Sequence, residues 1–196
     1  MVCLYPPYAC ITINIVTLLL LSRWSSATAK SIISSQLHLP MKGKTCPFPS
    51  LLISKACKGT ASISSQEQAC IESLTSNRHT AYASTVFELA KVALNLAMEK
   101  AECTMILIGS PKKPCLKSCA ENYKDSVVEG LKKAEWSMAK GDLDATDDEL
   151  SLARDAADYC HMVLSVDPDD ARSPVFSANR DVYNHITYAM SAADLL

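Results

Sequence analysis

The sequence predicts an all-α protein: an antiparallel up-and-down four-helix bundle with a disulfide-bridged helical hairpin as an N-terminal extension. Three observations lead to this prediction. Apolar residues recur at intervals of three and four along four long segments after residue 80. Hydrophobic residues make up 48% of the 196 residues and there are only 5 glycines, as is typical of a folded helical chain. Because the connections between segments are short, the apolar stripes can be buried only against one another.

The N-terminal residues have the pattern of a targeting segment. The run ITINIVTLLLL at residues 11–21 has the length of a signal-peptide core but is too short to span a bilayer. The small residues Ala27, Thr28 and Ala29 form a suitable cleavage site after it. We therefore expect residues 1–29 to be a signal peptide and the mature protein to be secreted. Residues 30–45 show no sustained periodicity and are expected to be a flexible lead-in to a domain at residues 46–196.

Residues 46–77 are expected to form the hairpin. Two short apolar pieces, 51–56 and 69–74, flank a serine-rich spacer that lies between Cys57 and Cys70. Such a pair can be a disulfide, two metal ligands or two unrelated thiols. An oxidising compartment favours the disulfide, which would join two arms that are too short to hold together alone. By the chain-entropy model, a bridge closing a loop of this size contributes on the order of 3 kcal/mol.

The bundle is expected at residues 78–196, and apolar stripes mark its first two helices. Gly109, Ser110 and Pro111 stop the first helix. Its stripe consists of Val86, Ala90, Ala93, Ala97, Ala101, Met105 and Ile108. The second helix is expected to start near Pro114 and to end at Gly141. Its stripe consists of Leu116, Cys119, Tyr123, Val127, Leu131, Ala134 and Met138.

The third and fourth helices follow the same pattern. Two starts are open for the third helix, either Asp142 as its N-cap or a capping box of Thr146 and Glu149. Its stripe consists of Leu143, Thr146, Leu150, Ala153, Ala157, Cys160 and Leu164. After a turn at residues 167–170, Ser173 and Pro174 are expected to cap and begin the fourth helix. The fourth stripe consists of Ala178, Val182, Ile186, Ala189, Ala193 and Leu196.

The remaining cysteines allow several pairings. Cys119 and Cys160 lie about equally far from Gly141 on antiparallel neighbours, so a disulfide fits the register, whereas two buried thiols are the alternative. Cys103 and Cys115 straddle the first turn of the bundle and can form an extra disulfide. A competing pairing joins Cys115 to Cys46, and Cys46 can instead link two copies. A monomer and a Cys46-linked dimer are therefore both open.

No motif indicates catalysis, a metal site or a cofactor. A zinc site is disfavoured because its candidate ligands show no C-x2-C and no paired histidines; these ligands are Cys115, Cys119, Cys160 and His161. The densest acidic cluster lacks the spacing of an EF-hand and fits a solvated helix start; it comprises Asp142, Asp144, Asp147, Asp148 and Glu149. No nucleophile motif or phosphate loop accompanies the histidines, His38, His79, His161 and His185.

The charge of the chain argues against two classes of partner. The formal net charge is -2, the pI is about 6.1, and no long run of like charges occurs. Nucleic acid is therefore an unsuitable partner, and so is an anionic membrane once the signal peptide has been removed.

Particular residues of the chain resemble those of the plant invertase and pectin methylesterase inhibitor family. The first group is Cys57-Lys58-Gly59-Thr60 followed by Cys70 and Leu74. The second group begins at Cys119 and continues through Tyr123 and Val127 to Cys160. The third comprises Ser173-Pro174 and Asn179-Arg180 in the last helix. The resemblance covers residues 46–196, although the spacer between Cys57 and Cys70 is longer than is usual in the family and Cys46, Cys103 and Cys115 are additional.

The resemblance implies a protein inhibitor that is not itself an enzyme. It implies a bundle bridged from Cys57 to Cys70 and from Cys119 to Cys160, secreted to the apoplast or cell wall, that docks on a cell-wall enzyme. Invertase inhibitors of the family carry Pro-Lys-Phe between the second and third bundle helices, where this chain has Leu143-Asp144-Ala145. Pectin methylesterase is therefore the favoured target. The alternatives are a cell-wall or vacuolar invertase, and a non-inhibitory structural or allergen-like secreted bundle.

The expected contacts with the target lie at the turn between the second and third bundle helices. Exposed residues at and near this turn are the candidates: Lys132, Lys140, Asp142, Leu143, Asp144 and Ala145. The alternative interpretation is that they are ordinary solvated helix ends.

Overall fold

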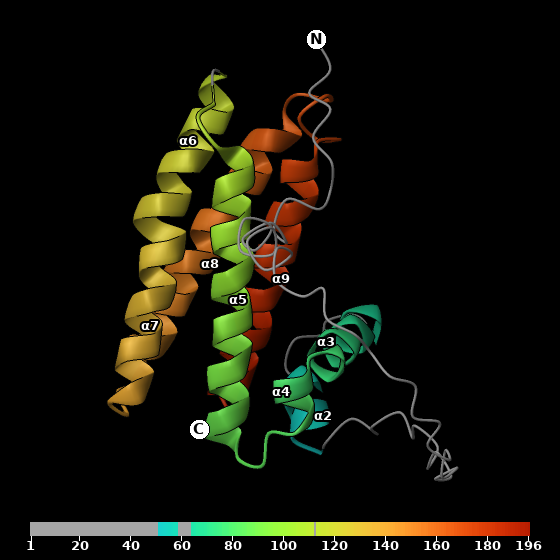
Figure 1. Ribbon diagram of the computed structural model, residues 1–196, viewed down its shortest axis with the longest axis vertical. Helices are drawn as coiled ribbons and strands as arrows, with labels where there is room; N and C mark the ends of the chain where they lie inside the picture. The colour runs from blue at the N-terminus through green and yellow to red at the C-terminus, as the bar shows by residue number, and fades with distance from the viewer. Residues whose placement is uncertain (1–50, 59–63, 112) are drawn as a thin grey trace, which may run out of the picture. The chain divides into compact units, whose positions relative to one another are not determined.

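The computed structural model describes residues 51–58, 64–111 and 113–196 (Figure 1). All of them belong to one unit, residues 47–196. The expected signal peptide (1–29), the lead-in (30–45) and Cys46 lie outside the described residues.

The predicted all-α bundle is confirmed. Helix α5 (Val86–Ile108) is followed by one continuous helix made of α6 (Pro114–Asn122), the π-helical segment η2 (Tyr123–Val128) and α7 (Glu129–Ala139), then by α8 (Leu143–Ser165) and α9 (Pro174–Ala193). Neighbouring helices run antiparallel (Figure 1). Helix α5 packs mainly against α9, and α8 packs against both α7 and α9. The apolar stripes meet inside this arrangement, where residues such as Ala97, Leu131, Ala157 and Ile186 are fully buried.

The helix ends are fixed by side-chain caps. The Thr85 hydroxyl accepts a hydrogen bond from the Glu88 amide at 3.1 Å. The Ser173 hydroxyl accepts one from the Phe176 amide at 3.2 Å, as the sequence predicted for an N-cap before proline. For α8 the structure selects Asp142 as the cap, because its carboxylate accepts from the Ala145 amide at 3.2 Å. The alternative capping box is wrong, since Thr146 is the fourth residue of α8 and donates its hydroxyl proton to the Asp142 carbonyl.

The π-helical segment η2 was not expected from the sequence. It lies in the middle of a row of four fully buried residues that follow one another at intervals of four: Cys119, Tyr123, Val127 and Leu131. In an α-helix each interval of four moves a side chain about 40° around the axis, so three such intervals would turn the last residue away from the core. A turn of a π-helix contains more residues than a turn of an α-helix, so η2 offsets this rotation and keeps the row facing the core.

Helices α7 and α8 approach each other closely at a glycine. A Cβ atom placed on Gly130 would lie 3.2 Å from the Cβ of Ala153 and 3.2 Å from the carbonyl oxygen of Glu149. A hydrogen at this position therefore allows the two backbones to pack together.

The hairpin consists of α2 (Leu51–Lys58) and α3 (Ser64–Ser76), and the short helix α4 (Arg78–Ala81) follows it. Helix α2 packs on α9 and α5 through the buried residues Ile53 and Ala56. Asn77 caps α4 by accepting from the amide of His79 at 2.8 Å. The first long bundle helix begins at Val86, which is also the first residue of its predicted apolar stripe.

His185 of α9 links the bundle to the hairpin. Its Nδ1 donates to the carbonyl oxygen of Asp181 at 2.7 Å, so its Nε2 is the acceptor for the hydroxyl of Ser73 in α3, at 3.1 Å. Burial is the main reason that the pKa of His185 lies below its ordinary value of 6.5, and the positive charge of Lys100 in α5 lowers it further. The ring therefore resists protonation more in the folded protein than in the unfolded chain.

Mild acid is expected to destabilise the folded protein through His185. The unfolded chain takes up a proton on this ring near pH 6.5, whereas the folded protein resists protonation to a lower pH. The stabilisation that depends on the neutral ring is complete above pH 6.5, the pKa in the unfolded chain. It is lost as the pH falls toward the lower pKa of the folded protein. We expect the thermal midpoint to fall less between about pH 7.5 and pH 5 in His185→Gln than in the wild type. Equal decreases in the two proteins would contradict this role.

Candidate functional site

Two disulfides stiffen the framework. Cys57 and Cys70 join α2 to α3 with an S–S distance of 2.04 Å and a Cα–Cα distance of 5.6 Å. Cys119 and Cys160 join α6 to α8 with distances of 2.17 Å and 5.1 Å. All four cysteines are fully buried. Because Cys119 and Cys160 are bonded to each other, the zinc alternative is wrong, and so is the alternative of two buried thiols.

The extra disulfide between Cys103 and Cys115 is not formed. Cys115 is a thiol in the first turn of α6, and it donates a hydrogen bond to the Asp170 carboxylate at 3.3 Å. The prediction failed because this turn faces the connection between α8 and α9 rather than α5. Burial, followed by the contact with Asp170, raises the pKa of the Cys115 thiol. A thiol held protonated in this way is a poor nucleophile and a poor metal ligand.

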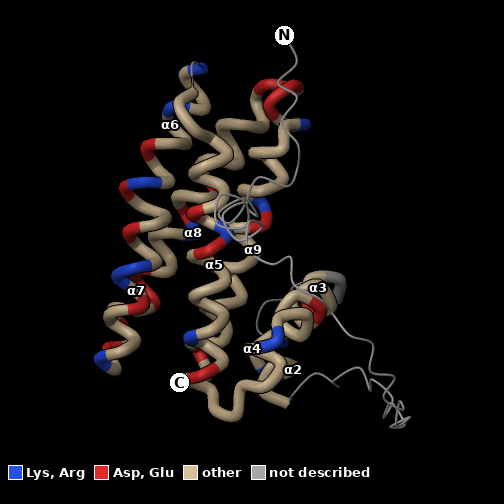
Figure 2. Tube along the Cα trace, in the orientation of Figure 1, with Lys and Arg blue, Asp and Glu red and all other residues tan. Residues whose placement is uncertain are grey.

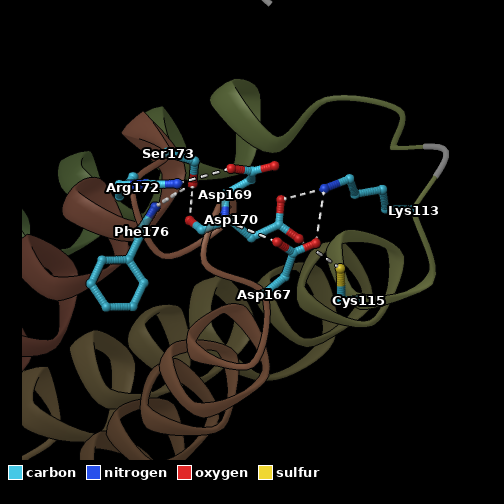
Figure 3. Close-up of polar contacts among 8 residues, drawn as sticks. All are labelled: Lys113, Cys115, Asp167, Asp169, Asp170, Arg172, Ser173 and Phe176. Carbon is cyan, nitrogen blue, oxygen red and sulfur yellow. Dashed lines mark hydrogen bonds and ion pairs between the residues drawn. The ribbon is translucent and has the colours of Figure 1, made fainter. Parts of the chain in front are cut away.

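A polar cluster at this end ties the two interhelix connections together (Figure 3). Lys113 pairs with Asp170 at 2.8 Å and with Asp167 at 3.4 Å. The hydrogen bond to Asp170 is the largest cause of the raised pKa of Lys113. The Asp169 amide donates to Asp167 at 2.9 Å and is the main reason that the pKa of that carboxyl is lowered. Each polar group has a partner within the cluster, which indicates a structural role.

The turn between α7 and α8, at the opposite end of the bundle, has a fixed backbone. The Gly141 amide donates to the Met138 carbonyl at 3.1 Å and the Asp142 amide donates to the Ser137 carbonyl at 3.0 Å. Together with the φ of 75° at Gly141, these bonds form a Schellman motif. The Asp142 carboxylate is used as the cap of α8, so among the expected target contacts this side chain has a structural task.

The other expected contacts of this region are solvent-exposed, apart from the half-buried Ala145. Lys132 pairs with Glu129 at 3.1 Å on the outer side of α7. Lys140 places its ammonium group 3.4 Å from the ring centre of Trp136. Leu143 is 42% exposed at the start of α8.

Trp136 is a further candidate contact, which was not predicted from the sequence. Its side chain is 62% exposed, and it lies between Lys132 and Lys140 at intervals of four, so that all three share one side of α7. Lysines and acidic residues alternate along the outside of this helix (Figure 2). The sequence did contain a signal for this. Trp136 is four residues from Lys132 and four from Lys140, so it lies on the lysine side of the helix and not on the buried stripe.

A row of apolar residues on the outside of α8 was also missed. Large side chains are exposed there: Leu152, Tyr159, Met162 and Val166. The Tyr159 hydroxyl lies 3.4 Å from that of Ser118 in α6, and Lys133 of α7 pairs with Glu149 of α8 at 3.9 Å. We call the outside of these two helices the α7–α8 face; it comprises Lys132, Lys133, Trp136, Lys140, Leu152, Tyr159, Met162 and Val166.

Two hollows lie elsewhere on the described surface. They have volumes of about 540 and 340 Å³, lie side by side along α4 and α5, and share His79 and Val92. Among the described residues, no three His, Cys, Asp or Glu side chains come together as metal ligands. None of the described helices has the length and hydrophobicity needed to cross a membrane.

One of two similar solved structures supports this fold. A crystal structure of a mutant form of a pectin methylesterase inhibitor from Arabidopsis is 23% identical, with a TM-score of 0.59, and the match covers 74% of this chain and 96% of that one. A second Arabidopsis pectin methylesterase inhibitor structure is 23% identical, with a TM-score of 0.49 and coverage of 76% and 98%. No curated protein matches the chain.

The family itself follows from the sequence match. The model of the plant invertase/pectin methylesterase inhibitor family matches residues 51–191, which include all four bridged cysteines and every bundle helix except the last residues of α9. This protein therefore belongs to the plant invertase/pectin methylesterase inhibitor family and is an enzyme inhibitor rather than an enzyme.

Proposed function

We propose that this protein is secreted and inhibits a plant pectin methylesterase by covering the enzyme's cleft with the α7–α8 face. The observation that carries the proposal is this exposed face on a disulfide-bridged bundle, where large apolar side chains line the outside of α8 and lysines and Trp136 line the outside of α7. Exposed apolar groups gathered on one surface are typical of protein-binding sites. Proteins of the family belong to the apoplast, which supports the expected signal peptide.

The rigidity of the bundle suits an inhibitor. The bond between Cys119 and Cys160 crosses from α6 to α8, and the Schellman motif fixes the turn that joins α7 to α8. A surface that is ordered before docking loses less conformational entropy when the complex forms. Less of the favourable contact free energy of the α7–α8 face is therefore offset by ordering when the complex forms.

The choice of target rests on the residues at this turn. Leu143, Asp144 and Ala145 stand where invertase inhibitors of the family carry Pro-Lys-Phe. The absence of Pro-Lys-Phe from this chain favours pectin methylesterase over invertase as the target enzyme. Invertase is the second candidate, because the family includes inhibitors of both enzymes.

Inhibition assays test the proposal directly. Oxidised mature protein is titrated against plant pectin methylesterase and against acid invertase at the pH of the apoplast. We expect loss of pectin methylesterase activity at a ratio close to one inhibitor per enzyme, with invertase unaffected. Inhibition of invertase alone would transfer the function to the second candidate. If a micromolar excess inhibits neither enzyme, the protein is a structural bundle.

Secretion is tested separately. The N-terminus of the protein recovered from the culture medium of plant cells should be Lys30. Retention of an intact chain inside the cells would contradict the proposed compartment.

A further inference from the structure

Trp136 and Lys140 form a pair that the fold leaves on the surface. The indole is 62% exposed, although Trp is a residue that proteins usually bury extensively. The ammonium group of Lys140 lies 3.4 Å from the centre of the ring. Among the described residues Lys140 makes no ion pair, whereas Lys132, on the same side of α7, is paired with Glu129. An indole and an unneutralised cation are thus presented together.

We propose that Trp136 and Lys140 act as one specificity-determining anchor that enters the cleft of the target enzyme. The indole fills an apolar recess, and the ammonium group pairs with a carboxylate at the rim of that recess. This inference rests on the proposed function, since it identifies the part of the α7–α8 face that carries most of the affinity.

The stability of the bundle does not account for the pair. A cation–π contact at an exposed site contributes only about 0.5 to 1 kcal/mol. The buried side of α7 is formed by Leu131, Ala134 and Met138, so the core is complete without Trp136. The pair therefore contributes little to folding. In protein interfaces, by contrast, Trp is among the residues whose truncation costs the most binding energy.

The pair is also held ready for docking. Trp136 lies next to Ser137, whose carbonyl accepts the Schellman hydrogen bond from Asp142, and Lys140 directly precedes Gly141. Asp142 then caps α8, so the backbone is fixed on both sides of the turn. Stacking on the indole restricts the lysine side chain before binding, which reduces the entropy lost when it meets a carboxylate.

Substitutions at the pair test the inference. Trp136→Ala should raise the inhibition constant for pectin methylesterase about 30-fold, the effect of losing a hot-spot residue. Trp136→Phe should raise it less, because a smaller ring still fills part of the recess. Lys140→Ala should raise it about tenfold at low salt and less at high salt, because screening weakens a cation–carboxylate pair. The thermal midpoints should stay within about 4 °C of the wild type.

Two matched variants provide controls. Tyr82→Ala removes an aromatic side chain that is 73% exposed beside α4, and Lys117→Ala removes an exposed lysine of α6. Both should inhibit as the wild type does. If Trp136→Ala also inhibits like the wild type while keeping its thermal midpoint, the inference is overturned and the proposed function stands. If the wild type inhibits neither pectin methylesterase nor invertase, both are overturned.

Discussion

Replacing both Cys119 and Cys160 with alanine is expected to lower the free energy of unfolding by about 4 kcal/mol. The bond closes a loop with a sequence separation of 41 between α6 and α8. Without it, the unfolded chain gains the conformations that the closed loop excludes, and the loss grows with loop length. Chemical denaturation of the double variant and the wild type under oxidising conditions measures the difference.

The hairpin disulfide provides the control for this prediction. In the chain-entropy model, replacing Cys57 and Cys70 with alanine removes a bridge over a separation of 13, which is worth about 3 kcal/mol. We expect this loss to be local. Amides of α2 and α3 should exchange faster with solvent, whereas amides of α8 and α9 stay protected. Equal loss of protection throughout the bundle would contradict a local role for the bond between Cys57 and Cys70. An unchanged free energy of unfolding in the Cys119/Cys160 double variant would contradict the loss predicted for that bond.

Asn179→Ala is expected to lower the free energy of unfolding by about 3 kcal/mol. The substitution leaves two buried polar groups, the Tyr123 hydroxyl and the Ala157 carbonyl, without a hydrogen-bond partner. The Tyr123 hydroxyl donates to the Asn179 side chain at 2.7 Å, and the same side chain donates to the Ala157 carbonyl at 3.0 Å. Both Asn179 and Tyr123 are fully buried, and burial raises the pKa of Tyr123 above its ordinary value. The amide thus joins three segments, η2, α8 and α9. Thermal and chemical denaturation of the variant measure the loss.

Two variants show whether the loss comes from this network. Tyr123→Phe removes one donor and leaves the bond to Ala157 in place, so it should cost about half as much. Asn95→Ala changes an exposed asparagine of α5 and should alter stability by less than about 0.5 kcal/mol. If Asn179→Ala behaves like Asn95→Ala, the buried network does not contribute to stability.

Local patterns in the sequence were enough to predict the helices and most of their ends. The intervals of three and four identify the buried side of α5 and α8, because these helices are regular along their whole length. Asn179 was identified as part of a family pattern, but its burial and its bond to Tyr123 depend on how α9 packs against η2. The Cys103–Cys115 prediction failed for a similar reason. Proximity along the chain did not reveal that α6 turns its first cysteine toward Asp170.

The sequence by itself determined the bundle, its cap at Ser173 and most of the residues that form its core. The exceptions include Leu143 and Leu196, which were placed on buried stripes but are 42% and 40% exposed at helix ends. The features that were predicted depend on interactions within one helix or on a periodicity that marks one side of it. Only the tertiary structure decided which side chains stay outside the packed helices, such as Trp136, and which polar groups from distant segments meet, such as Ser73 and His185. Exposure and long-range pairing depend on the neighbours that a helix receives, and those neighbours are set by the packing of the whole bundle.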